Sequence, residues 1–596
     1  MKFKDLAVYC DKIERVSSRL SITAHLAELF QKLDHHELEK TVYLLQGRVL
    51  PPYKQMEFGM AEKTMIKAVI SALNIDRSYF EKEYKKMGDI GKTVEFFKKQ
   101  YISFEEKDLT ILEVYDALYK SAAASGDKSQ EFKINQLSLL VRQLDALSAR
   151  YLVRIPLSLM RLGFSDMTVL DAYSWMIKGD KSLRASIEKA YHVRPDLGYI
   201  GRILKEKGFT VLQSIQPVLF TPIIMMRAER LSSGEEIIKQ IGTCAVEPKY
   251  DGFRLQVHYH KKSGEVRLYS RSLEEVSYMY PDIIEGVQRE VLSNEIIFEG
   301  EAIGYDPNTG SFLPFQDTVQ RKRKYGIAEK VKEIPLKFFS FELLYEAGEN
   351  YIHKPFVERR KKLESVIKST ANIDKDTIIL APHIIVSEGK KIELSFEDSI
   401  SKGLEGIIAK KRDGVYQPGA RAWNWIKFKR SYSSKIHDTI DCVVMGYDLG
   451  KGKRTGFGIG AFLVGIFDAE KEKYMTVAKI GTGLTDEEWR DLEEKSRQAK
   501  ADGKPGEYEI DKAMECDVWI VPRIIVEIKA DEITRSPVHT AGRILAYSKT
   551  GTLTEVKTPG YALRFPRLER FRIDKNIDEI TTVHEVKTMF SVQEKG

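Results

Sequence analysis

The chain has 596 residues, of which 43% are hydrophobic and 30% charged, with a formal net charge of +7. At about 100–200 residues per domain, this length predicts three or four domains rather than one core. No window approaches the ~18 uninterrupted apolar residues of a membrane helix, and the start of the chain lacks a secretory signal. These features exclude a membrane protein, and we expect a cytoplasmic monomer. The high content of Lys and Glu suggests a thermophilic source.

The four cysteines lie far apart in the sequence. They indicate neither a Cys-x-x-Cys zinc site nor a disulfide framework. Each is expected to be a small buried hydrophobic residue.

Residues 1–216 carry apolar residues at helical spacing and few strand-like alternations. The clearest helical segments are 20–33, 62–73 and 136–149. We therefore predict an all-α domain over 1–216. Most helical domains with surface lysines bind no nucleic acid, so the pattern alone assigns no function.

From about residue 217 to 432 the pattern changes to short strands broken by turns. Alternating segments at 245–259, 267–270, 295–303 and 336–344 predict an α+β domain with antiparallel sheets.

Lys249 lies in this middle region, between two short strand pieces, and is followed by an Asp251-Gly252 turn signal. A lysine there points into a cleft. Its amine becomes nucleophilic when desolvation or a neighbouring cation, such as Arg254, lowers its pKa. Lys-x-Asp-Gly is a short pattern, and a hairpin turn with surface charges fits it as well.

Residues 433–596 combine short strands with glycine-rich turns, which predicts a small barrel such as an OB-fold. The glycines at 450–460 lack the Gly-x4-Gly-Lys-Ser/Thr spacing, and Gly91-Lys92-Thr93 has Lys86 where the first glycine belongs. A P-loop ATPase is excluded. Positive charge concentrates at 321–324 and in a C-terminal cluster of Arg564, Arg567, Arg570, Arg572 and Lys575.

Six further short patterns follow the Lys249 segment in a fixed order. They are Tyr269-Ser270-Arg271, Phe298-Glu299-Gly300-Glu301, and the segments 340–345, 405–410, 425–429 and 564–575. Together with 244–254, they resemble the motifs of the covalent nucleotidyltransferases, which are the ATP-dependent DNA ligases, RNA ligases and mRNA capping enzymes. The large helical domain and Arg564-Phe565-Pro566-Arg567 favour an ATP-dependent DNA ligase of the archaeal and eukaryotic type over an RNA ligase, a capping enzyme or a catalytically inactive nucleic-acid clamp. The zinc-binding cysteines of NAD-dependent ligases are missing.

The resemblance implies that Lys249 attacks ATP to form a lysyl-AMP, that AMP passes to the 5′-phosphate of a nick in duplex DNA, and that the 3′-hydroxyl then seals the strand. Roles in DNA replication, repair and recombination are implied as well. By the same resemblance, Glu301 and Glu405 bind Mg²⁺, and Glu299 on the same strand face could share this role. The residues implied to contact the nucleotide are Glu247, Arg254, Arg271, Glu301, Phe341, Lys410, Arg421, Lys427, Lys429, Arg572 and Lys575.

Gln100-Tyr101-Ile102-Ser103-Phe104 resembles the short peptide by which such ligases dock on a sliding clamp. An ordinary helix-to-loop segment with a buried Phe fits these residues nearly as well.

Overall fold

The computed structural model describes residues 1–595 apart from 101–105, 307–310, 314, 324, 369, 371, 403, 430–438, 451–457, 482–483 and 548–552. The chain forms two compact units, Met1–Phe428 and Lys429–Gly596. The domain boundaries at 216 and 432 remain predictions. No helix in the described residues is long and apolar enough to cross a membrane.

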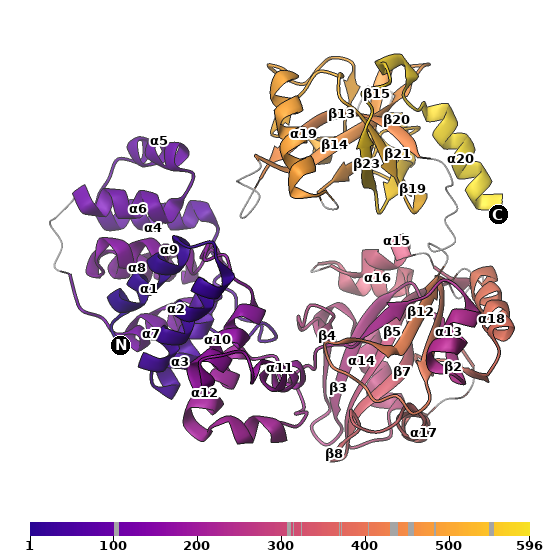
Figure 1. The fold of residues 1–596 in the computed structure, drawn as a ribbon, viewed down its shortest axis with the longest axis horizontal. Helices are drawn as coiled ribbons and strands as arrows, with labels where there is room; N and C mark the ends of the chain where they lie inside the picture. Colours follow the sequence, from indigo (N-terminus) through magenta and orange to yellow (C-terminus); the bar gives the residue numbers. More distant parts are fainter. Residues whose placement is uncertain are drawn as a thin grey trace. The chain divides into compact units, whose positions relative to one another are not determined.

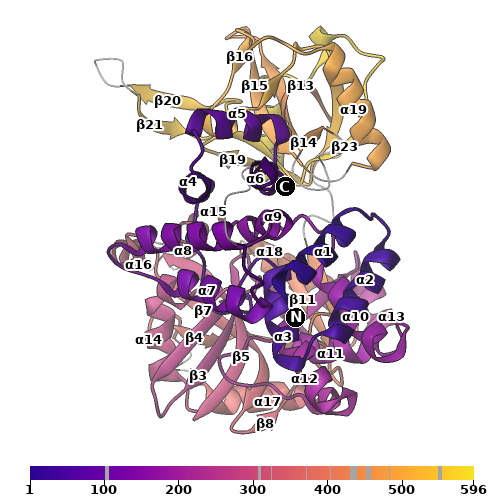
Figure 2. The same cartoon turned by 90° about the vertical axis from the view of Figure 1, so that its left-hand side faces the viewer.

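The N-terminal part of the first unit is helical, as predicted (Figures 1 and 2). Its helices are α1 (Phe3–Glu14), α2 (Arg19–Lys32), α3 (His35–Leu45), α4 (Glu62–Leu73), α5 (Arg77–Met87), α6 (Ile90–Gln100), α7 (Ile111–Ala123), α8 (Ser129–Gln143), α9 (Ala146–Arg154), α10 (Asp166–Lys178), α11 (Arg184–Val193) and α12 (Leu197–Lys207). They bury one continuous core that includes Leu26, Phe30, Leu38, Tyr173 and Ile200.

The segment 136–149, which the periodicity predicts as one helix, is divided between α8 and α9. The break lies at Leu144, and Asp145 caps α9. The Asp145 carboxylate accepts hydrogen bonds from the backbone N–H groups of Leu147 and Ser148, both at 3.0 Å. This capping satisfies donors that a continuous helix would not expose.

The middle of the chain forms two sheets, as the alternating segments predict. The five-stranded sheet has the order β1 (Arg227–Arg230), β12 (Arg421–Lys429), β11 (Gly406–Lys411), β2 (Cys244–Lys249) and β10 (Ile384–Val386). The seven-stranded sheet runs β4 (Glu265–Ser270), β3 (Phe253–His260), β5 (Glu295–Asp306), β7 (Leu336–Glu346) and β8 (Glu349–Asn350), with β6 (Ser311–Phe312) on β5 and β9 (Ile378–Leu380) on β7. Most neighbouring strands are antiparallel; β1 with β12 and β7 with β9 are parallel.

Each sheet is covered by helices on one face. Helices α13 (Gly234–Ile241) and α18 (Gly389–Ser401) pack on the five-stranded sheet (Figure 1). Helices α14 (Pro281–Glu290) and α17 (Phe356–Val366) pack on the seven-stranded sheet. The short helices α15 (Phe315–Thr318) and α16 (Ile327–Glu333) follow β6. The opposite faces carry polar groups together with a buried apolar cluster that includes Ile297, Leu344 and Trp425.

The second unit is rich in sheet. Its main sheet has the order β16 (Tyr508–Glu509), β15 (Lys473–Ile480), β14 (Ile459–Asp468), β13 (Ile440–Leu449), β18 (Ile525–Lys529) and β23 (Arg567–Phe571), with β17 (Val518–Trp519) on β13. Two smaller sheets pair β19 (Glu532–Ser536) with β22 (Gly560–Arg564), and β20 (Ile544–Tyr547) with β21 (Leu553–Thr558). The helices are α19 (Asp486–Gln498) and α20 (Val583–Lys595). This confirms a sheet-rich C-terminal region.

Candidate active site

The face of the five-stranded sheet that lies away from α13 and α18 carries most of the predicted site. Side chains alternate between the two faces of a strand. Val246, Ile407, Ala409, Ile426 and Phe428 lie in the core beneath α13 and α18. The residues between them, on the opposite face, are Glu247 and Lys249 on β2, Lys410 on β11, and Trp425, Lys427 and Lys429 on β12.

The seven-stranded sheet contributes a second polar face in the same way. Leu255 and Phe298 belong to the core beneath α14 and α17, so Arg254, Glu299 and Glu301 lie on the other side. Arg254 stands opposite Glu301 in the register of β3 and β5.

The two polar faces meet. The Lys410 amine donates a 2.7 Å hydrogen bond to the carbonyl oxygen of Phe341 on β7. The Arg254 guanidinium lies 5.2 Å from the Trp425 ring centroid and 5.5 Å from that of Phe341. Residues far apart in the sequence are thereby brought into one site.

Lys249 is the last residue of β2 rather than part of the connection, which corrects the predicted placement. Its side chain forms an ion pair with the carboxylate of Glu405, one of the predicted metal ligands. The turn after it is tight because Gly252 presses on β5: a Cβ at this position would stand 2.1 Å from the carbonyl oxygen of Ala302. Only glycine fits this approach without a shift of the backbone.

Glu299 is fully buried, and both of its carboxylate oxygens are engaged within the protein. Its carboxylate accepts hydrogen bonds from Arg254 (2.7 Å), Gln256 (3.0 Å) and Tyr416 (3.0 Å). Arg254 also donates to the carbonyl oxygen of Met226 at 2.7 Å. These bonds fix Arg254 on the seven-stranded sheet.

Glu301 and Glu405 are close enough to influence each other. Burial raises the pKa of the Glu301 carboxyl to about 7; Lys249 and Arg254 oppose the shift, and Glu405 adds to it. Among the described residues, no group of three or more His, Cys, Asp or Glu side chains is placed to hold a metal ion. The Asp251 carboxylate adds to the raised pKa of Glu301 as well.

Glu247 and Lys410 form a buried ion pair. Their side chains are 3% and 2% exposed, and the Lys410 amine lies 2.7 Å from Glu247 Oε2. Burial raises the pKa of Glu247 and lowers that of Lys410, and the attraction between the two charges opposes both shifts. The amine of Lys410 is thus engaged by Phe341 and Glu247.

Two arginines of α17 stand behind this pair and were missed from the sequence. Arg359 is buried and binds Glu342, next to Phe341, at 2.7 and 2.9 Å. The Nη1 atom of Arg360 lies 3.9 Å from Glu247 Oε1. No sequence signal distinguishes them, since they belong to a helix segment rich in charged residues.

Arg271 and Arg421 are exposed, at the end of β4 and the start of β12. Arg572 and Lys575 lie in the second unit. Both bind the carboxylate of Asp441, at 3.0 Å and 2.7 Å.

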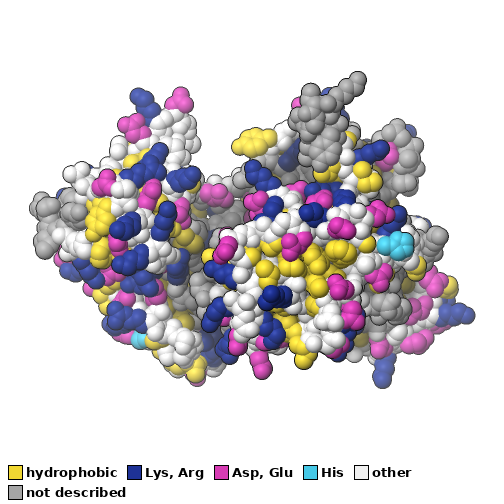
Figure 3. Space-filling model, turned by 90° about the horizontal axis from the view of Figure 1, so that it is seen from above, with side chains coloured by type: hydrophobic (Ala, Val, Ile, Leu, Met, Phe, Trp, Pro, Cys, Tyr) yellow, Lys and Arg dark blue, Asp and Glu magenta, His cyan; other side chains and the backbone are white. Residues whose placement is uncertain are grey.

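The predicted C-terminal basic cluster is compensated by acidic partners. Arg564 pairs with Glu532 at 2.6 Å, Arg567 with Asp531 at 2.6 Å, and Arg570 with Glu527 at 2.5 Å. In the segment 321–324, Arg321 is buried against Asp282, and Lys324 lies outside the described residues. Figure 3 shows basic and acidic side chains interspersed on the face it draws. In the described residues of both clusters, the positive charge is therefore partly neutralised by neighbouring carboxylates.

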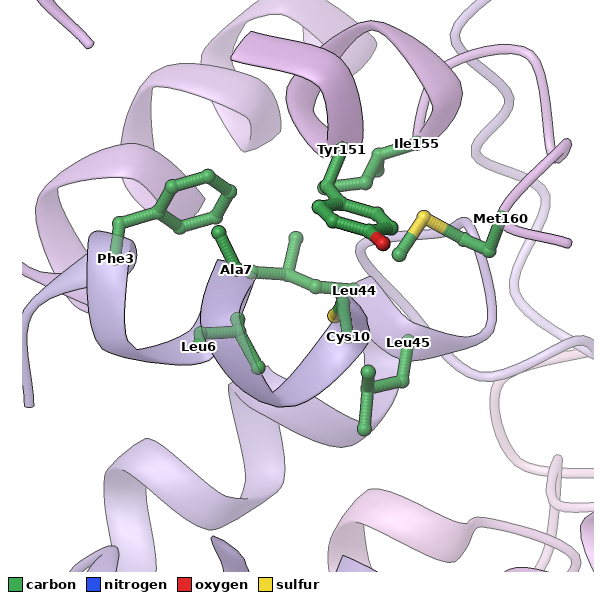
Figure 4. Close-up of a pocket in the computed structure, with 9 residues that line it drawn as sticks. All are labelled: Phe3, Leu6, Ala7, Cys10, Leu44, Leu45, Tyr151, Ile155 and Met160. Atoms are coloured by element: carbon green, nitrogen blue, oxygen red, sulfur yellow. The ribbon is translucent and has the colours of Figure 1, made fainter. Parts of the chain in front are cut away.

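Residues 101–104 of the predicted clamp-docking peptide lie outside the described residues; Gln100 ends α6. A small cavity among the N-terminal helices, lined by residues such as Phe3, Leu6 and Tyr151, has a volume of about 10 Å³ (Figure 4). Such a cavity is at the lower limit for a single water molecule, so it is no candidate ligand site.

Three parts of the chain match family models of DNA ligases. Residues 2–174 match the family model described as "DNA ligase N terminus", 225–429 match "ATP dependent DNA ligase domain", and 455–575 match "ATP dependent DNA ligase C terminal region". A "Probable DNA ligase" of Dictyoglomus thermophilum is 45% identical over 596 residues, covering 100% of this chain and 98% of the relative. A "DNA ligase" of Sulfurisphaera tokodaii is 39% identical over 606 residues, with the same coverage. Among solved structures, "Pmar-Lig_PreS3" is similar in fold, with a TM-score of 0.52 and 16% identity over 95% of this chain and 99% of that chain.

Proposed function

The chain belongs to the ATP-dependent DNA ligase family, and from this premise we propose that Lys249 is the residue that becomes adenylated. The observation that carries the proposal is the convergence of two polar sheet faces on Lys249, where it contacts Glu405. ATP-dependent DNA ligases transfer AMP from ATP to the enzyme, then to the 5′-phosphate at a break, and finally join the strands with release of AMP.

In the first step the Lys249 amine must lose a proton before it can attack. The Glu405 carboxylate contacts this amine and can accept the proton. The freed electron pair forms the bond from Nζ to the α-phosphorus, and the bond from this phosphorus to the bridging oxygen breaks, so that pyrophosphate leaves. The neighbouring cations Arg254, Lys427 and Lys429 neutralise charge on the phosphates in this scheme, with Arg271 and Arg421 at the rim.

The adenine is recognised by Glu247 and stacked by Phe341 in this proposal. Lys410 fixes both, because its amine binds the carboxylate of one and the carbonyl oxygen of the other. The backbone carbonyl of Phe341 and the Glu247 side chain are thereby tied to a single cation.

Glu301 and Glu405 fit a divalent cation such as Mg²⁺. The Glu405 carboxylate contributes to the raised pKa of Glu301, and a positive charge between the two would relieve this repulsion. Mg²⁺ commonly uses one or two carboxylates together with water and phosphate oxygens. When bound, Mg²⁺ supplies charge neutralisation at the phosphates.

Four further parts of the proposal concern the three domains and a partner. The helical region 1–216 binds nicked duplex DNA, 217–432 carries adenylation, and 433–596 is an OB-fold domain that supplies Arg572 and Lys575 to orient pyrophosphate during the first step. A sliding clamp docks on 100–104. If Phe104→Ala changes neither clamp binding nor clamp stimulation of sealing, the docking peptide is refuted.

The central test is incubation with α-labelled ATP followed by nicked DNA. We expect label on the wild-type protein, its transfer to DNA and a sealed strand. Lys249→Ala takes up no label, and Lys249→Arg takes up none either, since a guanidinium stays protonated. Lys411→Ala, which removes a half-exposed lysine at the end of β11, labels normally. Label retained on Lys249→Ala refutes the assignment.

A further inference from the structure

Two buried polar atoms beside the proposed adenine site are left without hydrogen-bond partners in the described part of the chain. They are Oε1 of Glu247 and Nη1 of Arg360. Both residues are more than nine-tenths buried, at 3% and 7% exposure. Buried polar atoms are nearly always paired, so an unsatisfied donor beside an unsatisfied acceptor calls for an explanation.

The two atoms cannot satisfy each other. They lie 3.9 Å apart, beyond the range of a hydrogen bond. The other oxygen of Glu247 is taken by Lys410 at 2.7 Å, and the Nε atom of Arg360 donates to Glu364 at 2.7 Å. Each side chain is therefore held by one hydrogen bond or ion pair, while Glu247 Oε1 and Arg360 Nη1 have no hydrogen-bond partner.

The neighbouring arginine shows what a purely structural residue looks like here. Arg359 donates to both oxygens of Glu342, and its Nη1 donates to the carbonyl oxygens of Lys354 (2.6 Å) and Gly414 (2.8 Å). Each of its three nitrogen atoms is engaged within the protein. Arg360 differs because its Nη1 is not.

An acceptor next to a donor complements a ligand edge that carries a donor next to an acceptor. Adenine has such an edge, formed by its 6-amino group and its N1 lone pair. The 6-amino group would donate to Glu247 Oε1, and N1 would accept from Arg360 Nη1. A carboxylate oxygen and a guanidinium nitrogen each have the spare capacity for one more bond.

We infer that Arg360 is a specificity-determining residue that reads the N1 position of adenine beside Glu247. This inference rests on the proposed role of the Lys249 site and names one more group in it. The charge-assisted bond from a guanidinium to a ring nitrogen is sensitive to loss of the acceptor, because the buried donor is then left unpaired.

The test compares ATP with 1-deaza-ATP, in which N1 is replaced by a C–H group. Adenylation is followed by pyrophosphate release, and kcat/KM is measured for each nucleotide. The wild-type enzyme is expected to prefer ATP by about 10- to 100-fold, the effect of one charge-assisted hydrogen bond. Arg360→Met is expected to lose a similar factor with ATP and to use the two nucleotides about equally.

Lys361→Met is the matched control, since it removes an exposed cation from the next position of α17 and should keep the wild-type preference. Arg360→Lys keeps the charge without the planar fork and is expected to lose most of the preference; it serves if Arg360→Met fails to fold. The inference is overturned if the folded variant discriminates between the nucleotides as the wild type does. Failure of Lys249→Ala to abolish labelling would instead refute the proposed nucleophile, and the ratio of the two nucleotides does not depend on that result.

Discussion

Replacing Lys410 by methionine removes the closest cation from a buried carboxylate. The ion pair with Glu247 is 2.7 Å long, with side chains 2% and 3% exposed, so water cannot take the place of the amine. Breaking a buried pair by removing one partner typically costs about 3–5 kcal/mol. The protein can limit this cost by protonating Glu247.

The cost of protonation sets the expected magnitude. The ordinary pKa of a glutamate is 4.5. At about 1.4 kcal/mol per pH unit, holding the proton at pH 7 costs about 3.4 kcal/mol, and at pH 5.5 about 1.4 kcal/mol. The folded variant then keeps a proton that the unfolded chain releases, so its free energy of unfolding decreases as the pH rises above 4.5. The deficit of Lys410→Met relative to wild type should shrink by at most about 2 kcal/mol between pH 7 and pH 5.5, and by less to the extent that burial already raises the pKa of Glu247 in the wild type.

Urea unfolding followed by tryptophan emission measures this difference, since the Trp425 ring lies 4.7 Å from the Lys410 amine. Lys411→Met, at a half-exposed position of the same strand, should change stability by no more than about 0.5 kcal/mol. The double variant Glu247→Gln with Lys410→Met should recover most of the loss, while ATP use stays impaired. An equal loss at both pH values refutes the reasoning, because the cost would then not arise from a buried anion.

Three other outcomes follow from the same structure. Gly252→Ala should slow adenylation by about 10- to 100-fold, because its Cβ would meet the Ala302 carbonyl oxygen at 2.1 Å and displace the turn after Lys249. The control Gly503→Ala should leave the rate unchanged, because no atom lies within 4 Å of the added Cβ. Burial lowers the pKa of His258 to about 3, so below pH 6.5 the unfolded chain binds a proton that the folded protein does not. The free energy of unfolding should therefore fall by about 1.4 kcal/mol per pH unit on acidification below pH 6.5. Urea unfolding of His258→Gln should show a smaller slope. Arg572→Ala should strongly slow adenylation while pre-adenylated nicks are still sealed; normal adenylation with poor, salt-sensitive sealing would show that Arg572 holds DNA instead.

The sequence predicted those parts of the site that depend on local pattern. The alternation along 425–429 predicts Lys427 and Lys429 on one face of a strand, and the burial of Ile426 and Phe428 in the core agrees with this. Asp145 was also a readable signal, since an Asp before an apolar run is a common helix cap, and the single predicted helix over 136–149 overlooked it.

What the sequence could not predict depends on pairing between distant residues. Arg359 and Arg360 stand among charged neighbours that resemble a solvated helix face, and only the contacts with Glu342 and Glu247 bury them. Likewise, the C-terminal arginines suggest a positive surface until the fold brings Glu527, Asp531 and Glu532 beside them. A cluster of basic residues in the sequence therefore does not establish a positive surface, because the acidic residues that neutralise it can lie dozens of positions away.

The shared contact of Arg572 and Lys575 with Asp441 changes what these two cations can offer a phosphate. A free cation that binds a phosphate gives up bound water. Arg572 and Lys575 must instead give up their contact with the Asp441 carboxylate. The gain is therefore the difference between two charge-assisted contacts, which is smaller than either contact alone. Because the contact with a phosphate and the contact with Asp441 are similar in strength, exchange between them is readily reversed. A phosphate can therefore be bound during one step and released before the next.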